Sequence, residues 1–129
     1  MARILVAEDD IHVMRLMALW LTKSGHEVLE AANGQEAKAM LAASDVDCIV
    51  TDVNMPICDG IELVRWLRED AKLFIPVTLL SARCDQEDLT ERLRDLDVDI
   101  YPKPFSPSRL LVEIERKLTR PQAPAGSNL

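Results

Sequence analysis

The chain has 129 residues, of which 48% are hydrophobic and 29% charged, a composition typical of one compact domain that buries its own core. Its net charge of −7 argues against a surface that binds nucleic acid or anionic lipid directly, so the expected partner is a protein. Cys48, Cys58 and Cys84 follow no metal-binding or redox spacing, and we expect reduced thiols in a cytoplasmic protein. The sequence opens without a signal-peptide pattern, and its apolar runs are too short to span a bilayer.

Apolar, strand-like runs alternate along the chain with segments of helical period. Strands are predicted at 4–7, 28–29, 48–51, 77–80 and 98–101. Helices are predicted at 11–24, 34–44, 60–72, 85–96 and 107–119. Five strand–helix repeats indicate an α/β fold with a doubly wound, five-stranded parallel sheet. One reversal of winding after the first strand gives the strand order 2-1-3-4-5.

This domain is expected to cover residues 1–119. Residues 120–129, RPQAPAGSNL, are rich in proline, glycine and small residues and show no periodicity. Their composition indicates either a flexible tail or the start of a linker.

Polar side chains follow four of the predicted strands at their carboxyl ends, where a doubly wound sheet forms its ligand crevice. The first strand ends at Glu8-Asp9-Asp10, the third at Asp52, the fourth at Ser81 and the fifth at Lys103. Close carboxylates repel one another unless a cation lies among them, and oxygen ligands of this kind suit Mg²⁺. The lysine and the hydroxyl suit anionic oxygens, so the pattern indicates a phosphoryl group on or beside Asp52.

Four segments occur in the order and at the separations found in one protein family: ILVAEDD, TDVNMPICDG, LLSAR and KPF. Through them, residues 2 to about 119 resemble the receiver domain of two-component response regulators, which has a flavodoxin-like fold. The resemblance implies a phosphoacceptor role for Asp52 and phosphoryl contacts for Lys103 and Ser81. It also implies metal contacts from Asp9 and Asp52 directly, from Glu8 through water and from the backbone carbonyl of Asn54.

The resemblance implies a signalling switch that catalyses only its own phosphorylation and dephosphorylation. Its cofactor would be Mg²⁺, with Mn²⁺ as a substitute. Its partners would be a sensor histidine kinase or phosphotransfer protein and an output domain or effector protein, and a homodimer stays open. The alternative is a pseudo-receiver scaffold that binds proteins without phosphorylation. A phosphohydrolase is disfavoured because Asn54 stands where such enzymes carry a second, proton-transferring aspartate.

One position departs from the usual receiver pattern, and one peptide bond is expected to have an unusual geometry. The aromatic switch residue expected three positions before Lys103 is replaced by Ile100, and the ring of Tyr101 falls on the opposite face of the strand. We therefore expect the fifth strand to report phosphorylation weakly. The Lys103-Pro104 bond is predicted to be cis because the chain must turn sharply while Lys103 points back to Asp52.

Some residues that could suggest chemistry have simpler interpretations. Asp10 is expected to be only a helix N-cap, and His12 and His26 are expected to be surface residues. Met14, Met17 and Trp20 recur at helical spacing and are expected to lie in the core.

Overall fold

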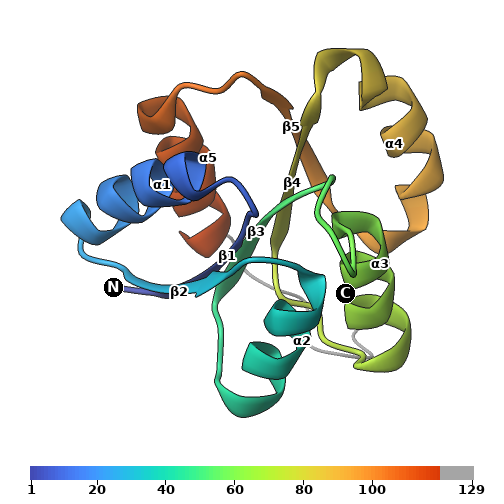
Figure 1. Ribbon diagram of the computed structural model, residues 1–129, viewed down its shortest axis with the longest axis horizontal. Coiled ribbons are helices and arrows are strands. Elements are labelled where there is room, and N and C mark those ends of the chain that lie inside the picture. Colours follow the sequence, from blue (N-terminus) through green and yellow to red (C-terminus); the bar gives the residue numbers. More distant parts are fainter. Residues whose placement is uncertain (120–129) are drawn as a thin grey trace.

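The computed structural model describes residues 1–119, and the expected tail or linker at 120–129 lies outside the described residues. Within this range five parallel strands form one sheet in the order β2-β1-β3-β4-β5, which confirms the predicted topology (Figure 1). The strands are β1 (Arg3–Ala7), β2 (Glu27–Ala31), β3 (Cys48–Asp52), β4 (Val77–Ala82) and β5 (Asp99–Lys103). The helices are α1 (Ile11–Lys23), α2 (Gly34–Ala43), α3 (Gly60–Arg65), α4 (Gln86–Arg92) and α5 (Pro107–Thr119).

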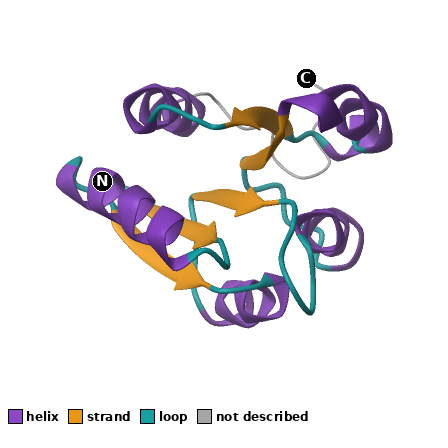
Figure 2. Ribbon diagram, turned by 45° about the horizontal axis from the view of Figure 1, so that its top comes forward, coloured by secondary structure: helices purple, strands orange, loops and turns teal. Residues whose placement is uncertain are grey.

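Side chains alternate between the two faces of the sheet, and each face has its own helices (Figures 1 and 2). In β1, Leu5 packs into a core cluster that includes buried residues of α2, α3 and α4. Its neighbours Ile4 and Val6 pack on the opposite face against α1 and α5. Both faces of the central strands are therefore covered, which explains why these strands are continuously apolar.

Three acid or amide side chains fix where helices begin. Asp10 accepts hydrogen bonds from the backbone N–H groups of α1, which confirms it as an N-cap. Asn33 accepts from the N–H of Glu36 at 2.9 Å, and Asp59 accepts from the N–H of Glu62 at 2.8 Å. These caps satisfy N–H groups that have no partner inside the helix, so the loop after each strand passes into its helix at a defined residue.

Two predicted helices are less regular than their periodicity suggested. The helix expected at 60–72 is α-helical only to Arg65 and continues as a π-helical segment, Trp66–Asp70. That segment buries Arg68, whose guanidinium donates to the carbonyl oxygens of Leu96, Leu73 and Asp97. The segment expected at 85–96 instead contains α4 flanked by two 3₁₀ turns, Arg83–Asp85 and Arg94–Leu96. The second turn ends at Asp97, whose left-handed φ of 52° breaks the helix before β5.

Two predictions about burial were wrong. The His26 side chain is only 8% exposed, because Ala2 and Glu115 contact both of its ring nitrogens. Trp20 is 37% exposed, and Leu21 takes the buried position beside Met14 and Met17. All three cysteines are free, as expected. None of the helices within residues 1–119 is long and apolar enough to cross a membrane.

Candidate functional site

Three carboxylates gather at the carboxyl edge of the sheet. β1 and β3 are direct neighbours, with Ala7 opposite Thr51, so the residues that follow β1 lie beside Asp52 at the end of β3. Glu8, Asp9 and Asp52 can each offer one oxygen such that the three oxygens lie within 4.8 Å of one another. The acids separated by more than forty positions in the sequence therefore share one small volume.

Glu8 is the most deeply buried of the three acids, with 3% of its surface exposed. Its Oε2 accepts a hydrogen bond from the N–H of Asp10 at 3.1 Å, while its Oε1 has no hydrogen-bond partner among the described residues. Burial raises the pKa of Glu8 to about 7, and the charge of Asp52 contributes in the same direction. A divalent cation would supply the buried oxygen with a partner and favour the ionised carboxylate, so this donor set fits Mg²⁺.

Lys103 closes the site from the end of β5. Its Nζ lies 3.0 Å from Oδ2 of Asp52 and 3.6 Å from Oε1 of Glu8. Burial by itself would lower the pKa of Lys103, but the two carboxylates outweigh that effect and the pKa is raised. The ammonium therefore stays charged at neutral pH. The Lys103-Pro104 peptide bond is cis, as predicted.

The loop that follows β3 holds Asp52 rigidly. Asp52 Oδ1 accepts from the N–H of Val53 at 2.9 Å, and the N–H of Gly60 donates to the Val53 carbonyl oxygen at 2.9 Å. A Cβ at Gly60 would clash with the Asp52 carbonyl oxygen, so only glycine allows α3 to start this close to the strand. At the outer tip of the loop, Ile57 has a φ of 70°. This loop also carries Asn54, which is exposed and lies two residues after Asp52.

Ser81 lies at the same edge of the sheet, near the end of β4, and is 3% exposed. Its Oγ accepts a hydrogen bond from Nε2 of Gln86, the first residue of α4, at 2.6 Å. Gln86 was not predicted from the sequence, because no motif or periodicity distinguishes it from an ordinary helix-surface glutamine. Its position five residues after Ser81, across the 3₁₀ turn, was the only available signal.

The two residues that precede Pro102 in β5 face opposite sides of the sheet, as the strand alternation predicted. Ile100 packs against the cluster that contains Leu89 and Leu93. Tyr101 packs against the other cluster, beside residues of α5. The ring of Tyr101 therefore lies on the face of the sheet away from α4.

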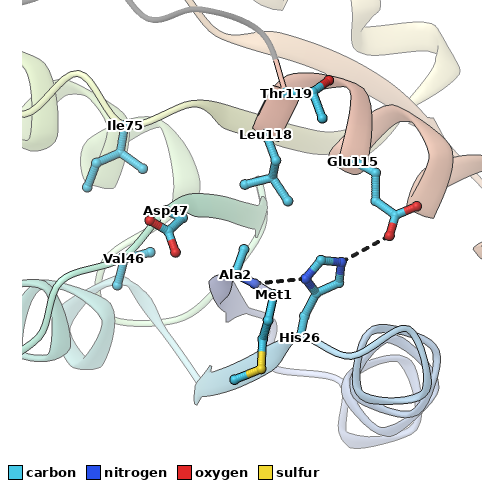
Figure 3. A pocket seen from close by; sticks show the side chains of 9 residues that line it. All are labelled: Met1, Ala2, His26, Val46, Asp47, Ile75, Glu115, Leu118 and Thr119. Atoms are coloured by element: carbon cyan, nitrogen blue, oxygen red, sulfur yellow. Dashed lines mark hydrogen bonds and ion pairs between the residues drawn. The ribbon is translucent and has the colours of Figure 1, made fainter.

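A cavity of about 670 Å³ lies at the opposite, amino-terminal edge of the sheet (Figure 3). Ala2, His26 and Asp47 line it just before β1, β2 and β3 begin, and Leu118 closes it from the end of α5. His26 Nδ1 accepts from the N–H of Ala2 at 3.1 Å, and Nε2 lies 3.0 Å from the Glu115 carboxylate. Because these contacts join the start of the chain to α5, the histidine has a structural role here.

A doubly wound sheet whose carboxyl edge sets clustered acids against a lysine is the arrangement expected of a receiver domain of two-component signalling. Residues 4–115 match the family model of the response regulator receiver domain, and the chain belongs to this family. Receiver domains are signalling domains that bind Mg²⁺ at an acidic pocket, and Glu8, Asp9 and Asp52 form an acidic cluster in this chain.

Named relatives agree with this assignment. Transcriptional regulatory protein SrrA of Staphylococcus aureus is 31% identical over 120 residues, which cover 93% of this chain and 49% of that protein. The chain thus spans about half the length of the curated relatives it matches. The receiver domain of the Francisella response regulator 1452 superposes with a TM-score of 0.85 at 30% identity, covering 92% of this chain and 97% of that one. Chemotaxis response regulator CheY4 of Vibrio cholerae gives a TM-score of 0.82 at 31% identity, covering 91% and 98%.

Proposed function

We propose that Asp52 accepts a phosphoryl group from a phosphohistidine on a sensor histidine kinase or phosphotransfer protein. The observation that carries this proposal is the position of the Asp52 carboxylate, between the acids Glu8 and Asp9 and the Lys103 ammonium at 3.0 Å. An Asp52 oxygen would form the new bond to phosphorus. The phosphorus–nitrogen bond would break, its electron pair remaining on the imidazole, which then takes up a proton. Most of the rate enhancement in such a transfer comes from positioning and charge neutralisation.

The acidic pocket would hold Mg²⁺, or Mn²⁺ as a substitute, through Asp9, Asp52 and the backbone carbonyl of Asn54, with Glu8 acting through water. The metal, when bound, supplies positive charge that neutralises phosphoryl oxygens. Lys103, which now pairs with Asp52, would pair with the phosphoryl group once it is attached. The Ser81 hydroxyl would donate a hydrogen bond to a phosphoryl oxygen.

The domain would act in the cytoplasm as a switch, with residues 1–119 as the receiver unit, and would catalyse only the gain and loss of its own phosphoryl group. Response regulators pair a receiver with a histidine kinase and an output function. SrrA is about twice as long as the matched region, whereas CheY4 is matched over nearly its whole length. An output domain in the same chain and a separate effector protein are therefore both consistent with these relatives. The alternative is a pseudo-receiver scaffold, and the intact Asp9, Asp52 and Lys103 disfavour it.

The test is phosphorylation by acetyl phosphate in the presence of Mg²⁺, followed by intact-mass measurement. We expect one phosphoryl adduct on the wild-type protein and none on Asp52→Ala or after addition of EDTA. Asp45→Asn, which changes an exposed acid at the other edge of the sheet, should be modified like the wild type. An adduct that persists in Asp52→Ala would refute the site assignment. Absence of any adduct on the wild type would favour the pseudo-receiver.

A further inference from the structure

The hydroxyl of Ser81 is tied to α4 by one polar contact. Gln86 Nε2 donates to Ser81 Oγ at 2.6 Å, and within residues 1–119 no other side chain hydrogen-bonds this hydroxyl. Ser81 is almost fully buried at the edge that carries Asp52, while Gln86 is partly exposed at the first position of α4. The contact therefore connects the proposed phosphorylation site directly to the start of a helix.

The fifth strand contacts the site through Lys103, which pairs with Asp52, but within residues 1–119 none of its side chains hydrogen-bonds the Ser81 hydroxyl. Ile100 has no polar group that could exchange partners with Ser81, and its β-branched side chain has restricted χ1 freedom. It packs in the apolar cluster beneath α4. Tyr101 has a hydroxyl but packs on the other face of the sheet. A change at the Ser81 hydroxyl thus has a polar side-chain route to α4, whereas β5 is joined to β4 there only through the backbone pairing of the strands.

Gln86 also lines a groove of about 340 Å³ between α4 and β5. Ile100 and Leu93 contribute apolar surface to this groove, and Thr90 and Arg94 contribute polar groups. The hydroxyl of Thr90 donates to the Gln86 carbonyl oxygen at 2.7 Å, so the first turn of α4 is bonded to the next. A displacement of Gln86 would therefore alter the wall of the groove as well as the start of the helix.

We propose that Gln86 is the positioning residue that transmits the state of Asp52 to α4 and its groove. This inference rests on the proposed phosphorylation of Asp52. A serine hydroxyl can accept one hydrogen bond while donating another, so Ser81 keeps its bond from Gln86 when its proton turns toward a phosphoryl oxygen. The movement of Oγ then draws Gln86 and the first turn of α4 with it. In this chain Gln86 takes over the reporting that Ile100 is unable to perform.

Four variants separate this role from a merely structural one. Gln86→Leu keeps the size and helix propensity of the side chain but removes the donor. Gln86→Glu replaces the donor with an acceptor-only carboxylate, which would claim the Ser81 proton that the phosphoryl group needs. Glu87→Leu is the matched control, because it makes a similar polar-to-leucine change at the adjacent, exposed position. Arg92→Gln controls for the change of −1 in net charge, because Arg92 is exposed at the end of α4 and does not line the groove.

The measurement is backbone amide chemical shifts with and without beryllofluoride, a phosphoryl mimic, in the presence of Mg²⁺. In the wild type we expect changes around Asp52 and from Ser81 through Arg92. In Gln86→Leu the changes at Asp52 and Ser81 should remain, whereas those from Leu89 to Arg92 should shrink by roughly five-fold, the effect of one neutral hydrogen bond on a two-state equilibrium. Glu87→Leu should respond like the wild type.

Titration adds a second readout. Beryllofluoride should bind Gln86→Glu about ten-fold more weakly than wild type, because a charge-assisted hydrogen bond competes for the Ser81 proton. Arg92→Gln should bind close to wild type. Undiminished α4 changes in Gln86→Leu, with Asp52 still responding, would overturn the inference and leave the proposed function standing. A wild-type protein that shows no response at Asp52 would refute the proposed function and this inference together.

Discussion

Ile57, at the tip of the loop that follows Asp52, is predicted to carry backbone strain that a single substitution can release. Its φ is 70°, and the N–H of Cys58 donates to the Pro56 carbonyl oxygen at 2.7 Å, so the chain reverses within three residues. A β-branched side chain is strongly disfavoured in this region of backbone space, whereas glycine enters it freely. Ile57→Gly should therefore stabilise the folded protein.

Three contributions set the size of the effect. Strain of this kind is worth about 1–3 kcal/mol. The substitution to glycine offsets about 0.4–1 kcal/mol of this stabilisation, because glycine gives the unfolded chain more conformational freedom. Ile57 is 79% exposed, so the packing that is lost amounts to only about 0.5 kcal/mol. The net expectation is a gain of about 1 kcal/mol in the free energy of unfolding, or about 3–5 °C in Tm for a domain of this size.

Urea and thermal unfolding of the metal-free protein, followed by circular dichroism, would measure this change. Ile57→Val keeps the β-branch and should stay within about 0.5 kcal/mol of wild type. Phe74→Gly places glycine at another exposed apolar loop residue whose φ is not positive, and it should destabilise because no strain is released there. An Ile57→Gly protein no more stable than wild type would refute the strain argument.

Two further predictions concern buried polar side chains. Lys117→Met should lower the free energy of unfolding in urea by about 2 kcal/mol, because Lys117 Nζ donates to the Val77 carbonyl oxygen at 2.9 Å and pairs with Asp99 at 2.6 Å. Arg116→Met, on the exposed side of α5, should change the free energy of unfolding little. His26→Leu should destabilise by about 1 kcal/mol, because the Ala2 N–H loses its acceptor, while the same change at exposed His12 should be near neutral. Equal losses within either pair would contradict the assigned contacts.

The arrangement of the site could be predicted because the carboxyl ends of parallel strands lie at one edge of the sheet. Asp52 and Lys103 lie far apart in the sequence, yet each ends a strand, and the ends of parallel strands meet at one edge. Strand order, which the alternating pattern and a single reversal of winding supply, brings the end of β5 to the same edge as the end of β3. The long side chain of Lys103 then reaches past β4 to place its Nζ 3.0 Å from Asp52 Oδ2. The roles assigned to these residues stay predictions until the phosphorylation experiment is done.

Side-chain burial was less predictable where it depends on distant segments. His26 follows a glycine in a turn, which locally resembles a solvated position. Its burial comes from Ala2 and Glu115, at opposite ends of the described chain. Trp20 was misplaced for a different reason. Six residues advance a helix by well under two full turns, whereas seven nearly complete them, so Leu21 rather than Trp20 shares the face of Met14.

Gln86 illustrates a third kind of limit. Its importance depends on one hydrogen bond across a 3₁₀ turn, and the sequence pattern predicted a single helix over that region. Neither helical periodicity nor resemblance to the family singles out the first residue of α4. Only the contact between two particular side chains does so.

The two outer strands of the sheet have a consequence for self-association. Pro102 lies within β5, which among the strands of residues 1–119 pairs with β4 alone, and a proline has no N–H to offer a further strand. At the other edge, β2 exposes Glu27 and Glu30, so a second copy of the chain would bring like charges together. Neither edge strand therefore favours pairing with a strand of a neighbouring molecule. The edge strands themselves thus oppose strand-by-strand aggregation, and any association between copies would use helix faces and loops.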